Sequence, residues 1–533
     1  MTGWNEPSRL VSWGRLAAVL LALLLYAGAL GHDFLIDDET IIAANIRLAP
    51  GQSPLQIFRR PEQFADFTLP YYRPLTNLTY WLDSRIWGLR PGGFHLSNWL
   101  LHGANTLLSF QVALALSGRA LPAVLCAVLF ASHPIHSESV SMVQGRTDLL
   151  VTLFTLLGLL AFRRALRAST SGQCVLASAG SLAAFAAALL SKETATTWPL
   201  LAVGLVWLGP ATTRAWRSRY MALGGGAFLV LAAYLLLRWH LLGQIAPFDP
   251  GSFGAARGGL VAITLATYLR FLVWPFSFSF VRTIPVPDSL WEPRVLSALL
   301  LAALILAGAV VLLRRHRLGA VAMSWTLIPL LPVLNVFPIP GFTVAERYMY
   351  LPSVGFCLLS ALVLEAAIRE DRRLALRAAG LVSLLALVGL FAATIQARSA
   401  EWADPVRVYE RMVAHAPASF FVQGKLGLEY LAAGRIEEAV LALTRARDLE
   451  PKNPVAWNNL GVALARRGRL PEARDAYRQA IALRPGYVKA YENLGLVLAG
   501  MGDGAGAEAA FARAQALAAE EGAALRQNEK LKN

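Results

Sequence analysis

The chain of 533 residues is too hydrophobic for an ordinary soluble protein. Hydrophobic residues make up 56% of it and charged residues only 16%, whereas soluble domains contain about 25% charged residues. This composition excludes most soluble classes and indicates a membrane protein with several spans.

The net charge of +15 does not indicate a nucleic-acid partner. Residues 398–533 hold 19 Lys and Arg against 16 Asp and Glu, so most of the positive charge lies in the hydrophobic part of the chain. There it forms short Arg clusters between apolar runs, which is typical of the cytoplasmic loops of membrane proteins. No nucleic-acid motif accompanies these clusters, and we expect no nucleic-acid binding.

Eleven apolar runs predict membrane-spanning helices, since one span needs about 20 mostly apolar residues. The runs lie near residues 14–30, 96–116, 119–133, 147–162, 174–190, 195–209, 219–237, 295–313, 318–334, 348–367 and 375–395. The first run resembles a signal peptide, but many runs follow it, so we expect an uncleaved first span. The stretch 258–280 is interrupted by Arg270, Trp274 and Pro275 and is expected to be interfacial or re-entrant.

The Arg clusters predict the orientation of these spans. If the N-terminus is cytoplasmic, the clusters all fall on the cytoplasmic side, as the positive-inside rule requires; they lie at 163–167, 214–219, 314–317 and 369–377. The loops 31–95, 238–294 and 335–347 then face outward, as does the C-terminal part of the chain. We therefore expect a membrane domain at 1–397 with its N-terminus in the cytoplasm.

An internal repeat of 34 residues follows a predicted linker at 398–416. Shifting the sequence by 34 residues aligns prolines, glycines and aromatic residues, which is the tetratricopeptide (TPR) pattern. The repeats are predicted at 417–450, 451–484 and 485–518, with a polar tail at 519–533. Three repeats are near the minimum for a stable array. We therefore expect the array to be stabilised by packing against the membrane domain or against a partner.

Such repeats usually present a concave surface to a peptide, although a purely structural array is the alternative. The candidate groove residues are Trp457, Asn459, Tyr491 and Asn493. The predicted fold class is all-α: a polytopic membrane helix bundle of about 11 spans, followed by a TPR α-solenoid.

Polar clusters gather at the outer ends of the spans. They are Asp37-Asp38-Glu39 and the stretches 133–148, 191–194 and 337–356. Charged groups at membrane depth are costly and tend to line cavities or pathways, so the clusters indicate a site at the membrane surface. The simpler interpretation of the three carboxylates is a solvated turn or the start of a helix.

The membrane half resembles the GT-C type glycosyltransferases that use polyprenyl-phosphate sugars. Within these it is most similar to the TMTC group, the transmembrane O-mannosyltransferases with C-terminal TPR repeats. The matching pieces follow the family's order: FLIDDETI (34–41), YYRPLTNLTYWLD (71–83), PGGFHLSNWLLHGANTLL (91–108), HPIHSESVSMVQGRTDLL (133–150), SKETATTWP (191–199) and AERYMYLPSVGFCLL (345–359). The chain departs from the animal members in having about three repeats where they have more, and its Ala- and Arg-rich composition looks bacterial.

The resemblance implies transfer of a hexose, mannose by analogy, from a polyprenyl phosphate to a hydroxyl of protein Ser or Thr. It also implies an acidic general base in the first outer loop, which matches Asp37 or Asp38. We expect Asp37 to be the base and Asp38 to orient it, although the roles could be exchanged. Two neighbouring carboxylates raise one pKa, which suits a base that works near neutral pH.

Cations near the outer face are candidates for binding the donor phosphate. We rank Arg347 first, then Lys192 and Arg146, and Arg73 is a further candidate for sugar or phosphate. The alternative for each is an interfacial side chain that reaches toward lipid headgroups.

His133, His136 and Glu138 are candidates for contacting the sugar or the acceptor. These three side chains could also serve as zinc ligands. The His-Pro-Ile-His spacing is poor for a zinc site, and we predict no metal site. Because the donor is lipid-linked, no cofactor is expected.

Two other functions remain open at this point. One is a non-catalytic TPR scaffold for envelope assembly, and the other is a ligase or polymerase of surface polysaccharide. In each case we expect a multi-pass protein of a bacterial inner membrane, with a periplasmic TPR domain that binds the acceptor or a partner protein.

Overall fold

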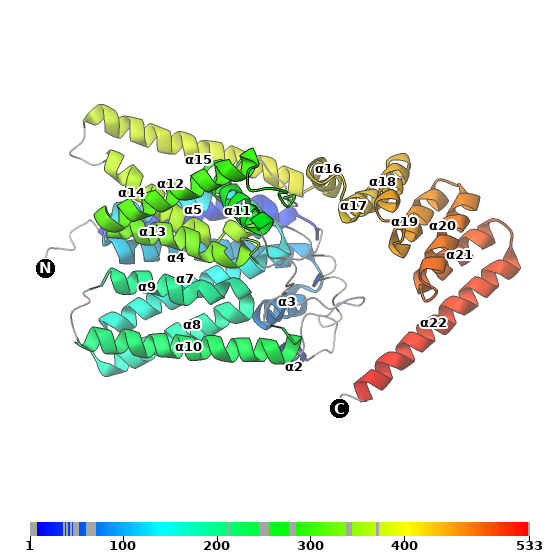
Figure 1. The fold of residues 1–533 in the computed structure, drawn as a ribbon, viewed down its shortest axis with the longest axis horizontal. Helices are drawn as coiled ribbons and strands as arrows, with labels where there is room; N and C mark the ends of the chain where they lie inside the picture. Colours follow the sequence, from blue (N-terminus) through cyan, green and yellow to red (C-terminus); the bar gives the residue numbers. More distant parts are fainter. Residues whose placement is uncertain are drawn as a thin grey trace. The chain divides into compact units, whose positions relative to one another are not determined.

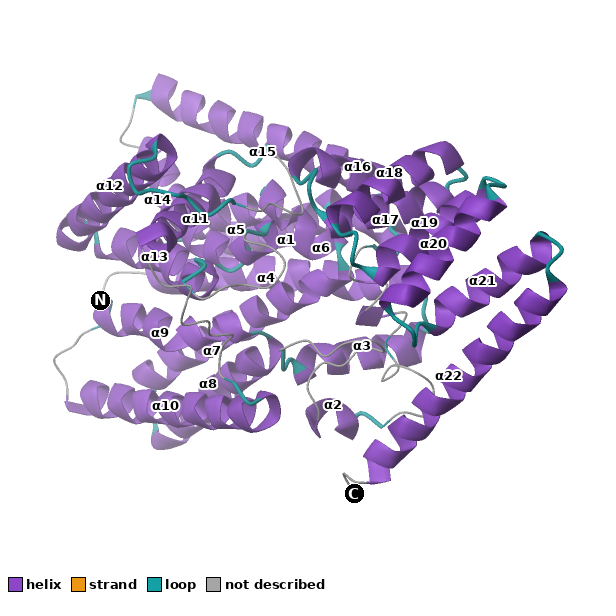
Figure 2. Ribbon diagram, turned by 45° about the vertical axis from the view of Figure 1, so that its right-hand side comes forward, coloured by secondary structure: helices purple, strands orange, loops and turns teal. Residues whose placement is uncertain are grey.

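The structure is a computed structural model, and it describes residues 8–35, 38, 41, 42, 45, 53–59, 71–209, 214–244, 255–276, 284–336, 344–368 and 373–530. Its contacts divide the chain into a membrane unit, 1–403, and a repeat unit, 404–533. Helices are the only regular elements in the described ranges, with no β-strand among them (Figure 2). The predicted all-α class is confirmed.

The membrane unit is built from long helices packed side by side (Figure 1). Its α-helices are α1 (Ser8–Leu25), α2 (Leu55–Arg59), α3 (Pro74–Trp87), α4 (Pro91–Ser117), α5 (Ala120–Ser132), α6 (Ser137–Ser141), α7 (Arg146–Arg167), α8 (Ser171–Ser191), α9 (Trp198–Trp207), α10 (Arg214–Leu242), α11 (Ala255–Val273), α12 (Pro293–Arg315), α13 (Arg317–Leu327), α14 (Pro352–Ile368) and α15 (Leu374–Trp402). Short 3₁₀ helices interrupt them, of which η4 (Pro134–His136), η5 (Val143–Gly145), η6 (Glu193–Thr197) and η9 (Glu346–Met349) concern the site.

The protein is a multi-pass membrane protein. Among the described helices, seven are long and apolar enough to cross a membrane, namely α1, α4, α7, α8, α10, α12 and α15, and the bent pair α5 and α6 would make an eighth. The remaining three predicted spans form α9, α13 and α14, which have 10, 11 and 17 residues. The predicted count of eleven is not confirmed, because these three are shorter than a full crossing.

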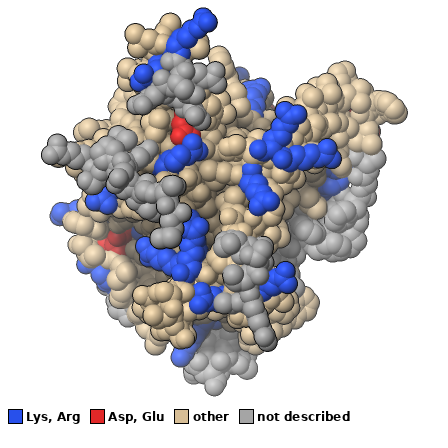
Figure 3. Space-filling view, turned by 90° about the vertical axis from the view of Figure 1, so that its left-hand side faces the viewer, with Lys and Arg blue, Asp and Glu red and all other residues tan. Residues whose placement is uncertain are grey.

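Basic side chains gather at one end of the membrane unit (Figure 3). Helix α7 ends there with Arg163, Arg164 and Arg167, and α12 ends there with Arg314 and Arg315. This end therefore carries the charge that the positive-inside rule assigns to the cytoplasmic surface.

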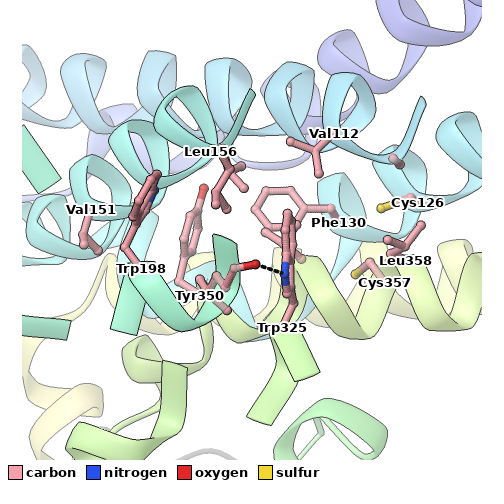
Figure 4. Close-up of a cluster of buried hydrophobic side chains, with 14 of the residues drawn as sticks. Val112, Cys126, Phe130, Val151, Leu156, Trp198, Trp325, Tyr350, Cys357 and Leu358 are labelled. Atoms are coloured by element: carbon pink, nitrogen blue, oxygen red, sulfur yellow. Dashed lines mark hydrogen bonds between the residues drawn. The ribbon is translucent and has the colours of Figure 1, made fainter. Parts of the chain in front are cut away.

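The core of the membrane unit is formed mainly by α4, α5, α7, α8, α9, α10, α13 and α14, and Figure 4 shows part of it. The Trp325 indole N–H donates to the Leu201 carbonyl oxygen at 3.1 Å, which joins α13 to α9. Trp198 stacks on Phe185 with ring centroids 4.8 Å apart. These aromatic side chains keep their polar atoms paired, as burial at membrane depth requires.

The repeat unit consists of three helical hairpins. They are α17 (Phe420–Ala432) with α18 (Ile436–Leu449), α19 (Pro454–Arg466) with α20 (Leu470–Leu483), and α21 (Val488–Gly500) with α22 (Gly504–Lys530). In the central hairpin a Cβ on Gly461 would lie 2.6 Å from the Tyr477 ring, so only glycine allows this approach. Helix α22 continues into the predicted tail as far as Lys530.

The predicted linker is largely helical. Residues 398–402 complete α15, and Pro405–His415 form α16, which packs on α17. Tyr409 of α16 is buried and lies 34 residues before Leu443, the position at which Tyr477 and Phe511 follow in later hairpins. Helix α16 therefore covers the first face of the array as the second helix of a repeat would.

Helices α13 and α14 approach closely at Gly355. A Cβ built there would lie 2.5 Å from the Ala322 carbonyl oxygen and 2.6 Å from the Thr326 nitrogen. These are backbone atoms of α13, so they cannot move aside as the end of a side chain would.

We predict that Gly355→Ala lowers the free energy of unfolding by about 1–3 kcal/mol, because it overpacks the crossing. The matched control is Gly308→Ala in α12, where nothing lies within 4 Å of the added Cβ. That variant should be neutral or stabilised by up to about 1 kcal/mol, since alanine favours helix over glycine. Thermal unfolding in detergent measures both; equal effects would contradict the close crossing.

Candidate functional site

Three of the predicted polar clusters lie together at the end of the membrane unit opposite the Arg-rich end. They belong to η4 with α6, to η6, and to η9, and they meet the N-terminal end of α7. Each 3₁₀ segment interrupts or precedes an apolar helix, so its backbone turns the charged side chains inward. The cluster of ion pairs described below is therefore assembled from elements far apart in the sequence.

Asp38 is fully buried and holds the first outer loop against this cluster. Its two carboxylate oxygens accept hydrogen bonds from the Val143 and Gln144 backbone nitrogens at 3.0 and 2.8 Å. The contact places the loop at η5, directly before α7. Its neighbour Asp37 lies outside the described residues.

Arg146 is fully buried at the start of α7 and joins α3 and α4 to it. Its guanidinium pairs with Asp83 at 2.6 Å and donates to the Asn98 side-chain oxygen at 2.8 Å and the Phe94 carbonyl oxygen at 2.7 Å. Thr79 takes a further bond at 3.3 Å. Protein groups thus occupy most of its donors, which is the arrangement of a structural arginine.

Lys192 directly follows α8, and its side chain pairs with Asp148 in the first turn of α7. The Nζ–Oδ1 distance is 2.5 Å, and both side chains are buried. Burial lowers the pKa of Lys192 to about 8, even though the Asp148 charge acts in the opposite direction. The ammonium group is therefore a cation at neutral pH that titrates in the mildly alkaline range.

Glu193 is held between two arginines. Arg73 donates to Oε2 through Nε and an Nη at 3.1 and 3.0 Å, and Arg238 of α10 reaches Oε1 at 3.3 Å. Burial would raise the pKa of Glu193, but the two guanidinium groups lower it to about 2. Glu193 is therefore ionised, and it pairs with two cations.

Glu138 of α6 pairs with Arg347 of η9. The Arg347 guanidinium lies 2.6 Å from Oε1, and the Arg347 backbone nitrogen donates to Oε2 at 3.0 Å. The same 3₁₀ turn is held from the other side, where Glu346 pairs with Arg398 of α15 at 3.2 Å. Both pairs are buried, so the position of η9 is strongly constrained.

Tyr348 connects the lysine pair to the arginine pair. Its ring centroid lies 4.7 Å from Lys192 Nζ and 5.4 Å from Arg347 Cζ. Within the described part of the cluster, four cations (Arg73, Lys192, Arg238 and Arg347) face three carboxylates (Glu138, Asp148 and Glu193). Arginine and lysine side chains are the groups that most often bind phosphate and carboxylate in proteins.

The two predicted histidines are buried and bonded within the protein. His133 uses Nε2 toward the Leu272 carbonyl oxygen at 3.0 Å, and its Nδ1 accepts from the Ile135 nitrogen at 3.2 Å. His136 Nε2 lies 2.8 Å from the Ser353 hydroxyl. In the ranges that the structure describes, no three His, Cys, Asp or Glu side chains lie close enough to hold a metal ion.

An apolar pocket of about 430 Å³ opens beside His133. Its lining comes from α5, α11, α14 and α15 and includes Leu272, Phe356, Ser360 and Phe391. Almost all of its lining is apolar, so it suits a hydrocarbon chain.

In the repeat unit, three of the predicted groove residues are hydrogen-bonded to other residues of the array. The Trp457 indole N–H donates to the Pro451 carbonyl oxygen at 2.8 Å. Asn493 donates to the buried Asn458 at 2.9 Å, and Asn458 donates to Asn459 at 3.3 Å. This amide chain links α19 to α21, while Tyr491 is partly buried.

Sequence reasoning did not single out Asp148, Arg238, Tyr348 or Arg398. Asp148 lies inside the motif at 133–150. Arg238 directly follows the apolar run 219–237, so its place at the outer end of a predicted span could have identified it. Arg282, a further cation of the predicted outer loop 238–294, lies outside the described residues.

We predict that Arg146→Gln lowers the free energy of unfolding by about 3–5 kcal/mol, because Asp83 would remain buried without its partner. The matched control is Arg294→Gln, which breaks an exposed pair with Glu292 and should cost less than about 1 kcal/mol. Thermal unfolding in detergent compares them. Similar small losses in both would show that Arg146 is not a structural arginine.

Comparisons with known proteins found similarities to a family model, to solved structures and to curated relatives. A Tetratricopeptide repeat family model matches residues 425–488. A solved structure of MamA has 24% sequence identity to this chain. The match covers 26% of this chain and 80% of the MamA chain, with a TM-score of 0.22.

Curated relatives cover both units. The protein O-mannosyl-transferase TMTC4 of Mus musculus is 28% identical over 492 residues, 80% of this chain and 65% of its own length. The protein O-mannosyl-transferase F38B6.6 of Caenorhabditis elegans is 27% identical over 464 residues, 82% of this chain and 62% of its own. The chain thus spans less than two thirds of the length of these relatives. The predicted resemblance is confirmed: the curated homologues of this chain are TMTC protein O-mannosyl-transferases.

Proposed function

We propose that this protein is an integral membrane glycosyltransferase that moves a hexose from a polyprenyl phosphate to a hydroxyl of protein Ser or Thr. The observation that carries the proposal is the buried cluster in which Lys192 and Arg347, which come from different elements, both lie against the Tyr348 ring. The names of the homologues, protein O-mannosyl-transferases, support mannose as the sugar.

The charge of the cluster fits the proposed donor. A sugar joined to a lipid through one phosphate is a singly charged phosphodiester, an anion that arginine and lysine side chains bind well. After transfer the lipid phosphate is a monoester with about 1.5–2 negative charges. The cations therefore gain more from the leaving group than from the donor, and such differential stabilisation is what lowers a barrier.

The apolar pocket beside His133 supports a lipid-linked donor. It lies between helices of the membrane unit, and its rim includes Val273 and Val363, which are 70% and 65% exposed. A prenyl chain would bury apolar surface there at a gain of about 25 cal/mol per Å². A soluble nucleotide sugar has no long apolar chain that could fill this pocket.

The proposed chemistry is a single displacement. Asp37 takes the proton of the acceptor hydroxyl, the hydroxyl oxygen bonds to the anomeric carbon, and the bond from that carbon to the phosphate oxygen breaks. Asp38 positions Asp37, because both of its oxygens are bonded to backbone amides and it is poorly placed to accept a proton. The donor carries its own leaving group, so no cofactor takes part.

The repeat unit is proposed to bind the acceptor or a partner protein. We further propose a bacterial inner membrane, with the site and the repeats on the periplasmic side. This orientation requires α9, α13 and α14 to cross in addition to the eight longer candidates, which makes the number of crossings odd.

The first test is transfer of radiolabelled mannose from polyprenyl-phosphate mannose to endogenous proteins in membranes. We expect Asp37→Asn to lower the rate about 10²- to 10⁴-fold, the usual contribution of a general base, with unchanged thermal stability. Asp38→Asn should instead lower stability by about 1–3 kcal/mol, because asparagine leaves a buried backbone amide with a poorer acceptor.

The outcomes separate the alternatives. Label that appears on glycan and not on protein would indicate a polysaccharide ligase or polymerase. Normal labelling of protein by Asp37→Asn would show that Asp37 is not the general base. No labelling by the wild type, while cells still need the repeats, would favour a scaffold.

The pKa of Lys192 predicts how donor binding depends on pH. Its pKa is lowered to about 8, so the ammonium charge is complete below that pH and is lost as the pH rises through it. The phosphodiester does not titrate in this range. We therefore expect the KM for donor to rise above about pH 8 in the wild type, while Lys192→Arg stays flat, because arginine remains charged. Parallel profiles for the two proteins would contradict a role of Lys192 in binding.

A further inference from the structure

One side chain of the motif at 345–350 is more accessible than its neighbours. Glu346, Arg347, Met349 and Tyr350 are all buried, whereas Tyr348 is partly exposed. The neighbours are also held in place, since Glu346 and Arg347 form buried ion pairs and the Tyr350 hydroxyl lies 2.7 Å from His102 Nδ1. The 3₁₀ turn η9 is therefore held in place by its buried side chains, while the Tyr348 side chain stays partly accessible.

Two cations from different elements face the Tyr348 ring. Lys192 Nζ, at the end of α8, lies 4.7 Å from the ring centroid, and Arg347 Cζ, in η9, lies 5.4 Å from it. A cation near a tyrosine ring is attracted by the electrons of the ring, more strongly when water is excluded. An anion bound by both cations would therefore lie beside this ring.

The hydroxyl of Tyr348 is suited to such an anion. Burial raises the pKa of Tyr348, which keeps the proton on the oxygen at neutral pH, although Arg347 acts in the opposite direction. Nearby positive charge also draws electron density from the ring, which makes the O–H a stronger donor. In the described part of the chain, no residue is hydrogen-bonded to this hydroxyl.

We propose that Tyr348 is a donor-binding residue whose hydroxyl donates a hydrogen bond to an oxygen of the lipid-linked phosphate, between Lys192 and Arg347. This inference rests on the proposed function and extends it to a residue that supplies a hydrogen bond without adding charge. The alternative is that the ring only fills space between the two cations. A hydrogen bond to a charged oxygen is stronger than one to a neutral oxygen, so its loss should be measurable.

The test compares Tyr348→Phe with Tyr268→Phe. Tyr268 is a matched control: its ring lies 6.5 Å from that of Tyr348, but it is fully buried and its hydroxyl points to the Val333 carbonyl oxygen. We expect Tyr348→Phe to raise the KM for polyprenyl-phosphate mannose about tenfold, with the thermal unfolding temperature unchanged. Tyr268→Phe should leave the KM unchanged. A wild-type KM in Tyr348→Phe would overturn the proposal.

A second measurement separates this inference from the proposed function. Polyprenyl phosphate alone should raise the unfolding temperature of the purified protein, because a ligand that binds only the folded state stabilises it. If the wild type transfers no sugar but this shift is present and is reduced in Tyr348→Phe, the proposed function fails and the phosphate site stands. Equal shifts in the wild type and Tyr348→Phe would reject the site assignment.

Discussion

The membrane unit depends on one constraint: charge buried at the ends of apolar helices must be paired. Each pair at the site end joins elements far apart in the sequence; the pairs are Arg146–Asp83, Lys192–Asp148, Arg347–Glu138 and Arg398–Glu346. Breaking such a pair leaves a buried charge at a cost of about 3–5 kcal/mol. The pairs therefore set which helix ends can meet, while the apolar faces of the helices, which can slide over one another, specify register less strictly.

The same pairing gathers several cations at the site end of the membrane unit. Glu193 lies between Arg73 and Arg238, so one carboxylate pairs with two cations. Arg146, in contrast, is enclosed by protein acceptors and has a structural role in the fold. Cations that look alike in the sequence thus have different surroundings, and these surroundings depend on the side chains that neighbouring helices bring to each of them.

Much of the architecture followed from local patterns. Apolar runs predicted helices where α4, α7 and α12 lie, because a buried helix in lipid must be apolar along its whole length. The 34-residue shift predicted the hairpins because each repeat packs a glycine, such as Gly461, against a large side chain, such as Tyr477. The linker was less well predicted, since Ala400 stands before α16 where the repeats have a turn glycine, and α16 is recognised by the burial of Tyr409.

The sequence by itself determined the all-α class, the repeats and the polar segments that meet at the site, because each depends on composition or spacing along the chain. Only the tertiary structure decided the partners. Lys192 and Asp148 are 44 residues apart, and Arg347 and Glu138 are 209 apart. No local rule pairs residues at such separations. Whether an arginine is enclosed or faces a ligand depends on the side chains that other helices bring to it, and this was decided only when the helix ends came together.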